Sequence, residues 1–144
     1  MIDRIVLLSA LFCYPAVGKE YTAYLGGGSI HIRGEDYNEN HNLLAIGYKG
    51  LTIGTLKNSY DDQTYFAGYD LNQNNVYLTY GAVLGASYGY CGKNQKANYK
   101  TEYGCHTNKW LPLGVAYLSY SEYPIQPTVG LTWNAIVFTI RVEF

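Results

Sequence analysis

The chain has little charge and no long apolar run after its first residues. Asp, Glu, Lys and Arg make up 15% of its 144 residues, and the formal net charge is −1. Without a global basic field, we expect no nucleic-acid partner. After residue 20, no window holds the eighteen or so apolar residues that a membrane-spanning helix needs. A helical membrane protein is therefore excluded, and no later stretch shows the helical periodicity of an Ala-, Glu-, Lys- and Leu-rich segment.

Tyrosine and glycine dominate instead. The sequence holds 17 Tyr and 16 Gly. Tyrosine favours β-strands and, as an amphipathic ring, the boundary between membrane and water. Glycine is expected where strands bend or backbones approach closely. This composition indicates one domain rich in β-structure.

The first residues are typical of a signal peptide. Arg4 supplies a positive charge, residues 5–17 are mostly apolar, and Ala16 and Gly18 are small enough for a cleavage site. A buried first strand or a membrane-anchor helix is the alternative, but the run is short and Pro15 interrupts it. Cys13 follows the large residue Phe12, which argues against a lipid anchor. We therefore predict a signal peptide at 1–18 and one domain at 19–144.

Cleavage at that site leaves two cysteines, Cys91 and Cys105. An even number in an exported chain predicts a disulfide, with two free thiols as the alternative. In the chain-entropy model, closing a loop of about fifteen residues contributes roughly 3 kcal/mol.

The last ten residues carry the clearest strand pattern. One side of the segment is apolar, and the other holds Arg141 and Glu143 among its members. Charged side chains are accepted only in a wet or hydrogen-bonded interior, so the apolar side should be the outside. An inside-out strand of this length fits a tilted strand that crosses a membrane. The apolar side comprises Ile136, Phe138, Ile140, Val142 and Phe144.

Similar segments recur between turn signals. We predict strands at 20–33, 39–49, 51–58, 63–70, 75–89, 111–121, 124–132 and 135–144. The predicted fold is all-β: an eight-stranded antiparallel transmembrane β-barrel, with short periplasmic turns at 49–50, 71–74 and 122–123 and a long outer loop at 90–110. A soluble lipocalin-like barrel is the alternative fold, and it would need apolar residues inside. Eight strands leave too little room for an open pore.

His31 and Ser59 are the candidate catalytic residues. Both should lie at the outer rim, where a hydroxyl and an imidazole are the minimal machinery of acyl transfer. The alternative is that both serve local structure. His41 and His106 are weaker candidates, and Asp61 and Asp62 could bind a cation loosely. No spacing of His, Cys or Asp forms a metal site, so we expect no metal and no cofactor. Cationic residues expected at the same rim would suit contact with lipid phosphates, and the alternative is an ordinary solvated loop. These residues are Arg33, Lys57, Lys93, Lys96, Lys100 and Lys109.

Several short motifs, in a shared order over about 29–144, resemble the outer-membrane lipid A palmitoyltransferases (PagP). Ser29-Ile30-His31 matches the segment with the family's catalytic-site His, and Lys57-Asn58-Ser59 matches its Lys-Asp-Ser segment. The remaining matches are Asp36-Tyr37-Asn38-Glu39, Ala67-Gly68-Tyr69, Trp110-Leu111-Pro112-Leu113 and the closing strand 137–144.

The resemblance implies a monomeric barrel in the bacterial outer membrane that engages lipopolysaccharide and phospholipid and transfers an acyl chain between them. His31 would be the base, Ser59 the nucleophile or oxyanion donor, and Asn58 would orient one of them. The barrel would hold the acyl chain in a measuring pocket lined by small residues such as Gly85.

Two departures separate the chain from this family. It has no N-terminal amphipathic helix before the first strand, and Asn58 stands where the family has Asp. An amide cannot act as a general base, so the substitution favours altered or lost activity. The alternative function is a non-enzymatic barrel that modifies the cell surface or blocks a receptor, for instance one carried by a phage or mobile element. In that case the 90–110 loop would carry the function.

Overall fold

The computed structural model describes residues 20–32, 37–89 and 110–144, and the predicted signal peptide lies outside them. Within these ranges the protein is all-β and holds no helix long and apolar enough to cross a membrane. Its eight strands are β1 (Tyr21–His31), β2 (Asn40–Tyr48), β3 (Leu51–Lys57), β4 (Gln63–Asn74), β5 (Leu78–Tyr88), β6 (Trp110–Tyr120), β7 (Ile125–Leu131) and β8 (Ala135–Glu143).

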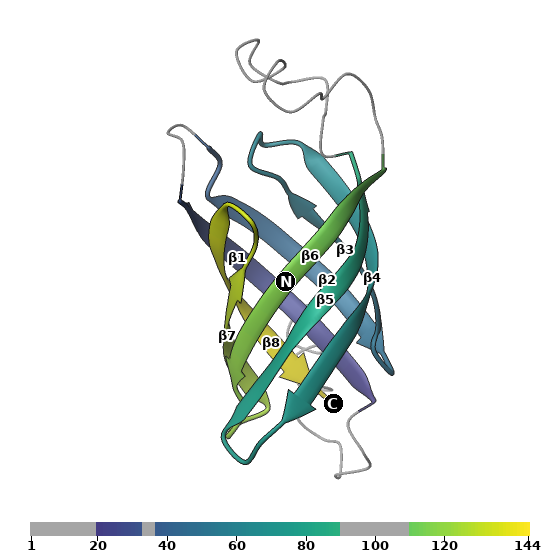
Figure 1. Ribbon diagram of the computed structural model, residues 1–144, viewed down its shortest axis with the longest axis vertical. Coiled ribbons are helices and arrows are strands. Elements are labelled where there is room, and N and C mark those ends of the chain that lie inside the picture. Colours follow the sequence, from purple (N-terminus) through teal and green to yellow (C-terminus); the bar gives the residue numbers. More distant parts are fainter. Residues whose placement is uncertain (1–19, 33–36, 90–109) are drawn as a thin grey trace, which may run out of the picture.

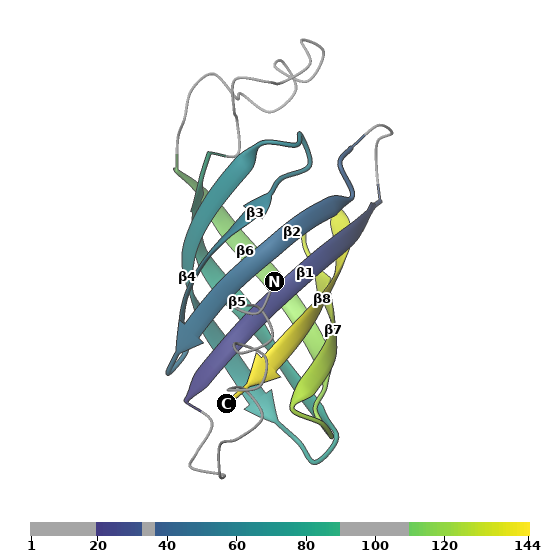
Figure 2. The same cartoon turned by 180° about the vertical axis from the view of Figure 1, so that it is seen from behind.

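The strands form one closed antiparallel barrel in sequence order, with β8 pairing back onto β1 (Figure 1). Backbone hydrogen bonds of 3.0 Å between Tyr21 and Phe144 join the first and last strands at one end of the barrel. We call this the lower end, because it lies at the bottom of Figures 1 and 2; it also carries the turns after β2, β4 and β6. The upper end carries His31, the β3–β4 loop and the start of β6 (Figure 2).

The predicted strand count and antiparallel order are confirmed, and one predicted turn is wrong. Residues 71–74 were expected to form a turn because they follow Asp70 and hold two Asn. Instead β4 continues to Asn74, and the turn lies at 75–77. The physical reason is Asp70, whose buried carboxylate bonds to tyrosines of β1 and β6 inside the barrel and holds this part of β4 against them.

Side chains are distributed inside out. Only five hydrophobic residues in the described ranges are buried, whereas exposed Leu, Ile, Tyr and Trp side chains cover the outer wall. The largest fully buried side chains are all polar: Arg141, Gln126, Asn58, Thr52, Thr64, Thr79 and Ser119. The prediction for the last strand is confirmed, because Arg141 and Glu143 are buried while Phe138 and Ile140 are exposed.

Candidate functional site at the upper rim

A glycine bulge in β1 turns the candidate residues into the barrel. Tyr24 and Ser29 are both buried, although they are an odd number of residues apart and strict alternation would place them on opposite faces. The pairing of β1 shifts register at Gly26–Gly28 against both neighbouring strands. Gly26 and Gly27 have backbone φ values of 72° and 136°, which residues other than glycine rarely adopt. The bulge therefore reverses the facing of the strand, so Ser29 and His31 point inward.

His31 and Ser59 meet at the upper rim. The Nε2 atom of His31 lies 2.9 Å from the Ser59 hydroxyl oxygen, which joins the last residue of β1 to the β3–β4 loop. The ring of Tyr37 stacks on the imidazole with 4.5 Å between centroids. The His31 Nδ1 atom is buried and has no hydrogen-bond partner among the described residues. The structure thus brings together the two residues expected from the sequence, and their catalytic role stays a prediction.

Asn58 organises the loop that carries Ser59. Its side-chain oxygen accepts the backbone N–H groups of Tyr60, at 2.8 Å, and of Asp62, at 3.1 Å. Its amide nitrogen donates to the Thr64 hydroxyl at 3.0 Å and to the Gly89 carbonyl at 3.3 Å. Both halves of the amide are needed, because one end accepts and the other donates. Asn58 therefore fixes the backbone of this loop, and its role in orienting His31 or Ser59 stays a prediction.

Asn38 connects this loop to the segment before β2. Its backbone N–H donates to the Ser59 carbonyl at 2.8 Å, and its side-chain amide donates to the Asn58 carbonyl at 3.0 Å. The segment that places Tyr37 over His31 is therefore held by the same loop that supplies Ser59. Three chain segments are fixed against one another at the rim.

A second serine–histidine pair, absent from the predicted site, lies on the same inner wall. The Nε2 atom of His41, on β2, is 2.7 Å from the hydroxyl oxygen of Ser29. Its Nδ1 atom is 2.6 Å from the backbone carbonyl oxygen of Lys57. Sequence reasoning placed His41 at a strand start and did not assign Ser29 a partner. The run of three glycines before Ser29 was the available signal, since glycine inside a strand often marks a bulge that redirects side chains.

The structure describes only some of the other predicted site residues. Lys57 is half-buried and pairs with Asp61 at 2.9 Å, so Asp61 contacts a cationic side chain of the protein itself. Asp62 is buried. Arg33, Cys91, Cys105 and His106 lie outside the described residues, as do Lys93, Lys96, Lys100 and Lys109, so the disulfide and most of the cationic rim stay predictions. No group of His, Cys, Asp and Glu within the described ranges could hold a metal ion.

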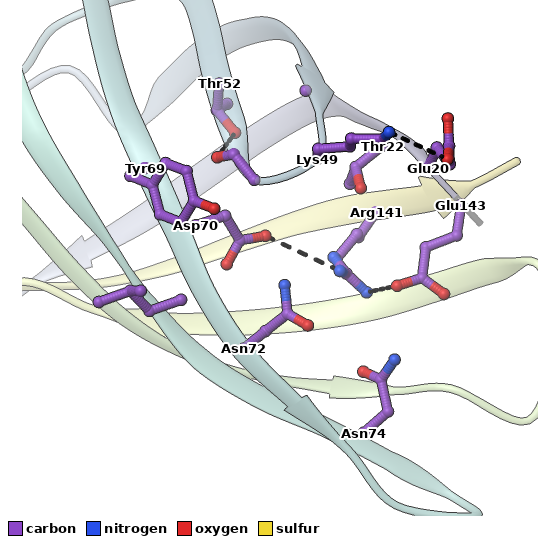
Figure 3. Close-up of a pocket in the computed structure, with 13 residues that line it drawn as sticks. Glu20, Thr22, Lys49, Thr52, Tyr69, Asp70, Asn72, Asn74, Arg141 and Glu143 are labelled. Carbon is purple, nitrogen blue, oxygen red and sulfur yellow. Dashed lines mark hydrogen bonds and ion pairs between the residues drawn. The ribbon is translucent and has the colours of Figure 1, made fainter. Parts of the chain in front are cut away.

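A network of charged and polar side chains lies in the lower half of the interior, and Figure 3 shows its ion pairs from Arg141 to Asp70 and to Glu143. Arg141 is 1% exposed and lies between Asp70, at 3.8 Å, and Glu143, which it contacts directly. The hydroxyls of Tyr24 and Tyr117 each donate to the Asp70 carboxylate at 2.6 Å. Gln126 accepts a bond of 2.9 Å from Arg141 and donates one of 3.2 Å to Glu143. Of these residues, Asp70, Arg141 and Glu143 line a polar pocket of about 350 Å³, which is also lined by Lys49 and Glu20, a surface ion pair.

Between this network and the rim, seven inward side chains are apolar, and the buried polar residues Thr64 and Ser87 lie among them. Each of the seven is half-buried and lies on the same face of the sheet as a buried neighbour. For example, Val115 pairs across strands with buried Val83, and Val137 pairs with buried Ser29. The set comprises Leu43, Leu56, Phe66, Leu111, Leu113, Val115 and Val137.

Small residues contribute to this section in two different ways. A Cβ on Gly54 would lie 2.4 Å from the Cβ of Ala45 and 2.7 Å from the Phe66 ring, so its missing side chain gives these neighbours room. Gly85 pairs with Gly68, and a Cβ there would lie 2.1 Å from the Ala67 carbonyl oxygen. Gly85 therefore permits the close approach of β4 and β5, and its expected place in a measuring pocket stays a prediction.

No protein-family model matches this chain, and no curated protein sequence matches it significantly. The resemblance to the PagP family therefore stays a hypothesis based on short motifs. What the geometry offers chemically is a hydroxyl paired with an imidazole at the upper rim, with apolar inward side chains and then the Arg141 network below it. A hydroxyl and a base within hydrogen-bonding reach are the requirement for acyl transfer.

Proposed function

We propose that this protein is a membrane-embedded barrel that transfers an acyl chain between lipids at its upper rim. The inside-out distribution of side chains supports the membrane location. A soluble protein exposes few contiguous apolar patches, whereas a barrel in lipid faces the hydrocarbon with its outer wall. The alternative is a soluble barrel around an apolar ligand cavity, which predicts apolar residues inside. The buried Arg141, Gln126 and Glu143 argue against it.

Aromatic residues at both ends of the outer wall support the same location. Exposed tyrosines cluster at the lower end, and exposed Trp110 and Trp133 lie at the upper end. Aromatic girdles of this kind mark the two interfaces of membrane barrels, with an aliphatic band between them. The lower tyrosines are Tyr21, Tyr48, Tyr77, Tyr120 and Tyr123.

The observation that carries the activity is the 2.9 Å contact between His31 and Ser59. In the proposed reaction, His31 takes the proton of the attacking hydroxyl and returns it to the leaving alcohol. Ser59 serves as the nucleophile or donates a hydrogen bond to the developing oxyanion. Asn58 keeps Ser59 in place by fixing the loop backbone.

The apolar section beneath the rim suits the acyl chain of the donor lipid. A chain seated there ends above the Arg141 network, where burying hydrocarbon against charged groups is unfavourable. Access from the lipid side is favoured at β6, because its pairing with β7 covers only Ala116–Ser119. Within the described residues, the upper part of β6 has no partner on that edge.

Phospholipid is the proposed donor and lipid A the proposed acceptor, both by resemblance to the PagP family. Lys57 lies at this rim and would attract their phosphates, and Arg33 is expected from the sequence to do the same. The proposed setting is the bacterial outer membrane, with the upper end outward and the lower end towards the periplasm. The polar, short-turned lower end and the longer upper connections agree with this orientation.

Mass spectrometry of lipids after incubation with the purified protein tests the proposal. We expect acylated lipid A to form with the wild-type protein, and its rate to fall at least about 100-fold in His31→Ala and Ser59→Ala. Asn72→Ala, which changes a residue of the lower pocket, is the matched control and should retain the wild-type rate. No product with any lipid pair, or equal rates in all variants, would contradict the proposed activity and favour a non-enzymatic surface barrel.

A further inference from the structure

The pair of Ser29 and His41 meets the geometric requirements for a nucleophile and its base. We propose that Ser29, activated by His41, is a second nucleophile of this site and forms a covalent ester with the acyl chain. The identity of that chain rests on the proposed function; the reactivity of Ser29 does not.

The backbone carbonyl of Lys57 fixes the tautomer of His41. A carbonyl oxygen can only accept, so the Nδ1 atom 2.6 Å away must carry the proton. In the neutral ring the Nε2 atom then has a free lone pair, and the Ser29 hydroxyl at 2.7 Å donates to it. A general base needs this direction of the hydrogen bond, from the hydroxyl to the imidazole, and here the Lys57 carbonyl holds the base in place. The hydroxyl of Ser59 can donate or accept, so the contact between His31 and Ser59 does not fix a tautomer in this way.

The position of Ser29 suits a reaction with a chain held in the barrel. Ser29 lies two residues before His31 on the same inward face, and it is paired with Val137 of the apolar section. Because of the glycine bulge, the hydroxyl points towards His41 inside the barrel instead of outward. The ester carbonyl of a lipid whose chain fills the apolar section would lie at this height. Ser29 is only 4% exposed, which would keep water away from an acyl-serine ester.

The proposed step is an ordinary acyl transfer. The Ser29 Oγ atom attacks the ester carbonyl of the donor lipid, and its proton moves to the Nε2 atom of His41. The bond from the carbonyl carbon to the lipid oxygen breaks, and that oxygen takes the proton from His41 as the alcohol leaves. An acceptor hydroxyl then repeats the sequence on the Ser29 ester, passes its proton to His41, and Ser29 recovers it.

A long-chain alkyl fluorophosphonate tests this directly, because it phosphonylates activated serines with loss of fluoride. The folded wild-type protein in detergent is treated with the probe, digested, and the modified residue is identified by mass spectrometry. We expect modification of Ser29. Ser87 is the internal control in the same molecule: it is 5% exposed and faces the same interior, but its hydroxyl donates to the Leu111 carbonyl instead of an imidazole.

The variant His41→Asn separates the two roles of the histidine. An asparagine amide can still donate to the Lys57 carbonyl from the position of Nδ1, but it offers no base at the position of Nε2. We expect the rate of Ser29 modification to fall at least about 100-fold in the folded variant. An unchanged rate would show that His41 is not the base and would overturn the proposal.

The outcomes distinguish this inference from the proposed function. Modification of Ser59 alone would overturn the role of Ser29 and leave the proposed function standing. The same holds if lipid acylation proceeds while Ser29 stays as unreactive as Ser87. Modification of Ser29 without any lipid acylation would support the second nucleophile while the proposed lipid substrates fail.

Discussion

Replacing Asp70 by alanine should strongly destabilise the barrel, because it breaks a buried network of charged and polar groups. The Asp70 carboxylate accepts the hydroxyls of Tyr24 and Tyr117, both at 2.6 Å, and lies 3.8 Å from Arg141. Removing one partner of a buried ion pair costs about 3–5 kcal/mol, because the other charge stays buried. Each tyrosine hydroxyl left without an acceptor adds about 1 kcal/mol or more.

The expected loss is about 4 kcal/mol, which is less than the sum of these terms because Glu143 still neutralises Arg141. Tyr117→Phe removes one hydrogen bond to a charged group and should cost about 1.5–3 kcal/mol. Asn72→Ala is the matched control: this exposed residue lines the same pocket from the same strand and should cost about 0.5 kcal/mol or less.

Denaturant unfolding in lipid vesicles, followed by the fluorescence of Trp110 and Trp133, measures the three free energies. We expect Asp70→Ala to cost most, Tyr117→Phe less, and Asn72→Ala least. A loss for Asp70→Ala no larger than that for Asn72→Ala would refute the reasoning. It would mean that water solvates the lower interior and that the charged network does not hold the strands together.

Three further changes probe the outer wall, the loop and the bulge. Leu84→Arg, near the middle of the exposed face of β5, should lower the free energy of unfolding in vesicles by about 2–4 kcal/mol. Val76→Arg, in the β4–β5 turn, should lower it by only about 0–1 kcal/mol, and equal losses would contradict a membrane location. Asn58→Asp should cost about 1–3 kcal/mol and yield no faster acyl transfer, because a carboxylate oxygen would face the Gly89 carbonyl; faster transfer at unchanged stability would contradict the structural role of Asn58. Gly27→Ala should cost about 1–3 kcal/mol because of its φ of 136°. Gly114→Ala should cost less, because its Cβ would make only an ordinary contact of 3.9 Å with Leu84; similar unfolding free energies would argue against strain at the bulge.

The barrel could be predicted because apolar outward residues and polar or small inward residues alternate with a period of two along most of its strands. In β8 the alternation of Phe138 and Ile140 with Arg141 and Glu143 identifies both faces correctly. The end of β4 could not be predicted in this way. Asp70 and the Asn residues after it are typical of turns, and only the tyrosines of distant strands make a strand favourable there.

The sequence predicts which strand ends carry the candidate site, but not every contact within it. Counting strands places His31 and Ser59 at the same rim, and the structure brings them to hydrogen-bonding distance. The pair of Ser29 and His41 was missed because the facing of Ser29 depends on the bulge at Gly26–Gly28, where one residue of slippage reverses every side chain. The hydrogen bond from His41 to the Lys57 carbonyl depends on how β2 packs against the end of β3, so no local sequence pattern predicts it.

The most direct test of the central claim is the rate of lipid acylation by the wild-type protein and by His31→Ala, measured by mass spectrometry with the same phospholipid and lipid A. The proposed function predicts acylated lipid A with the wild-type protein and at least about 100-fold less with the variant. Equal rates in the two proteins, or no product from the folded wild-type barrel, would contradict it.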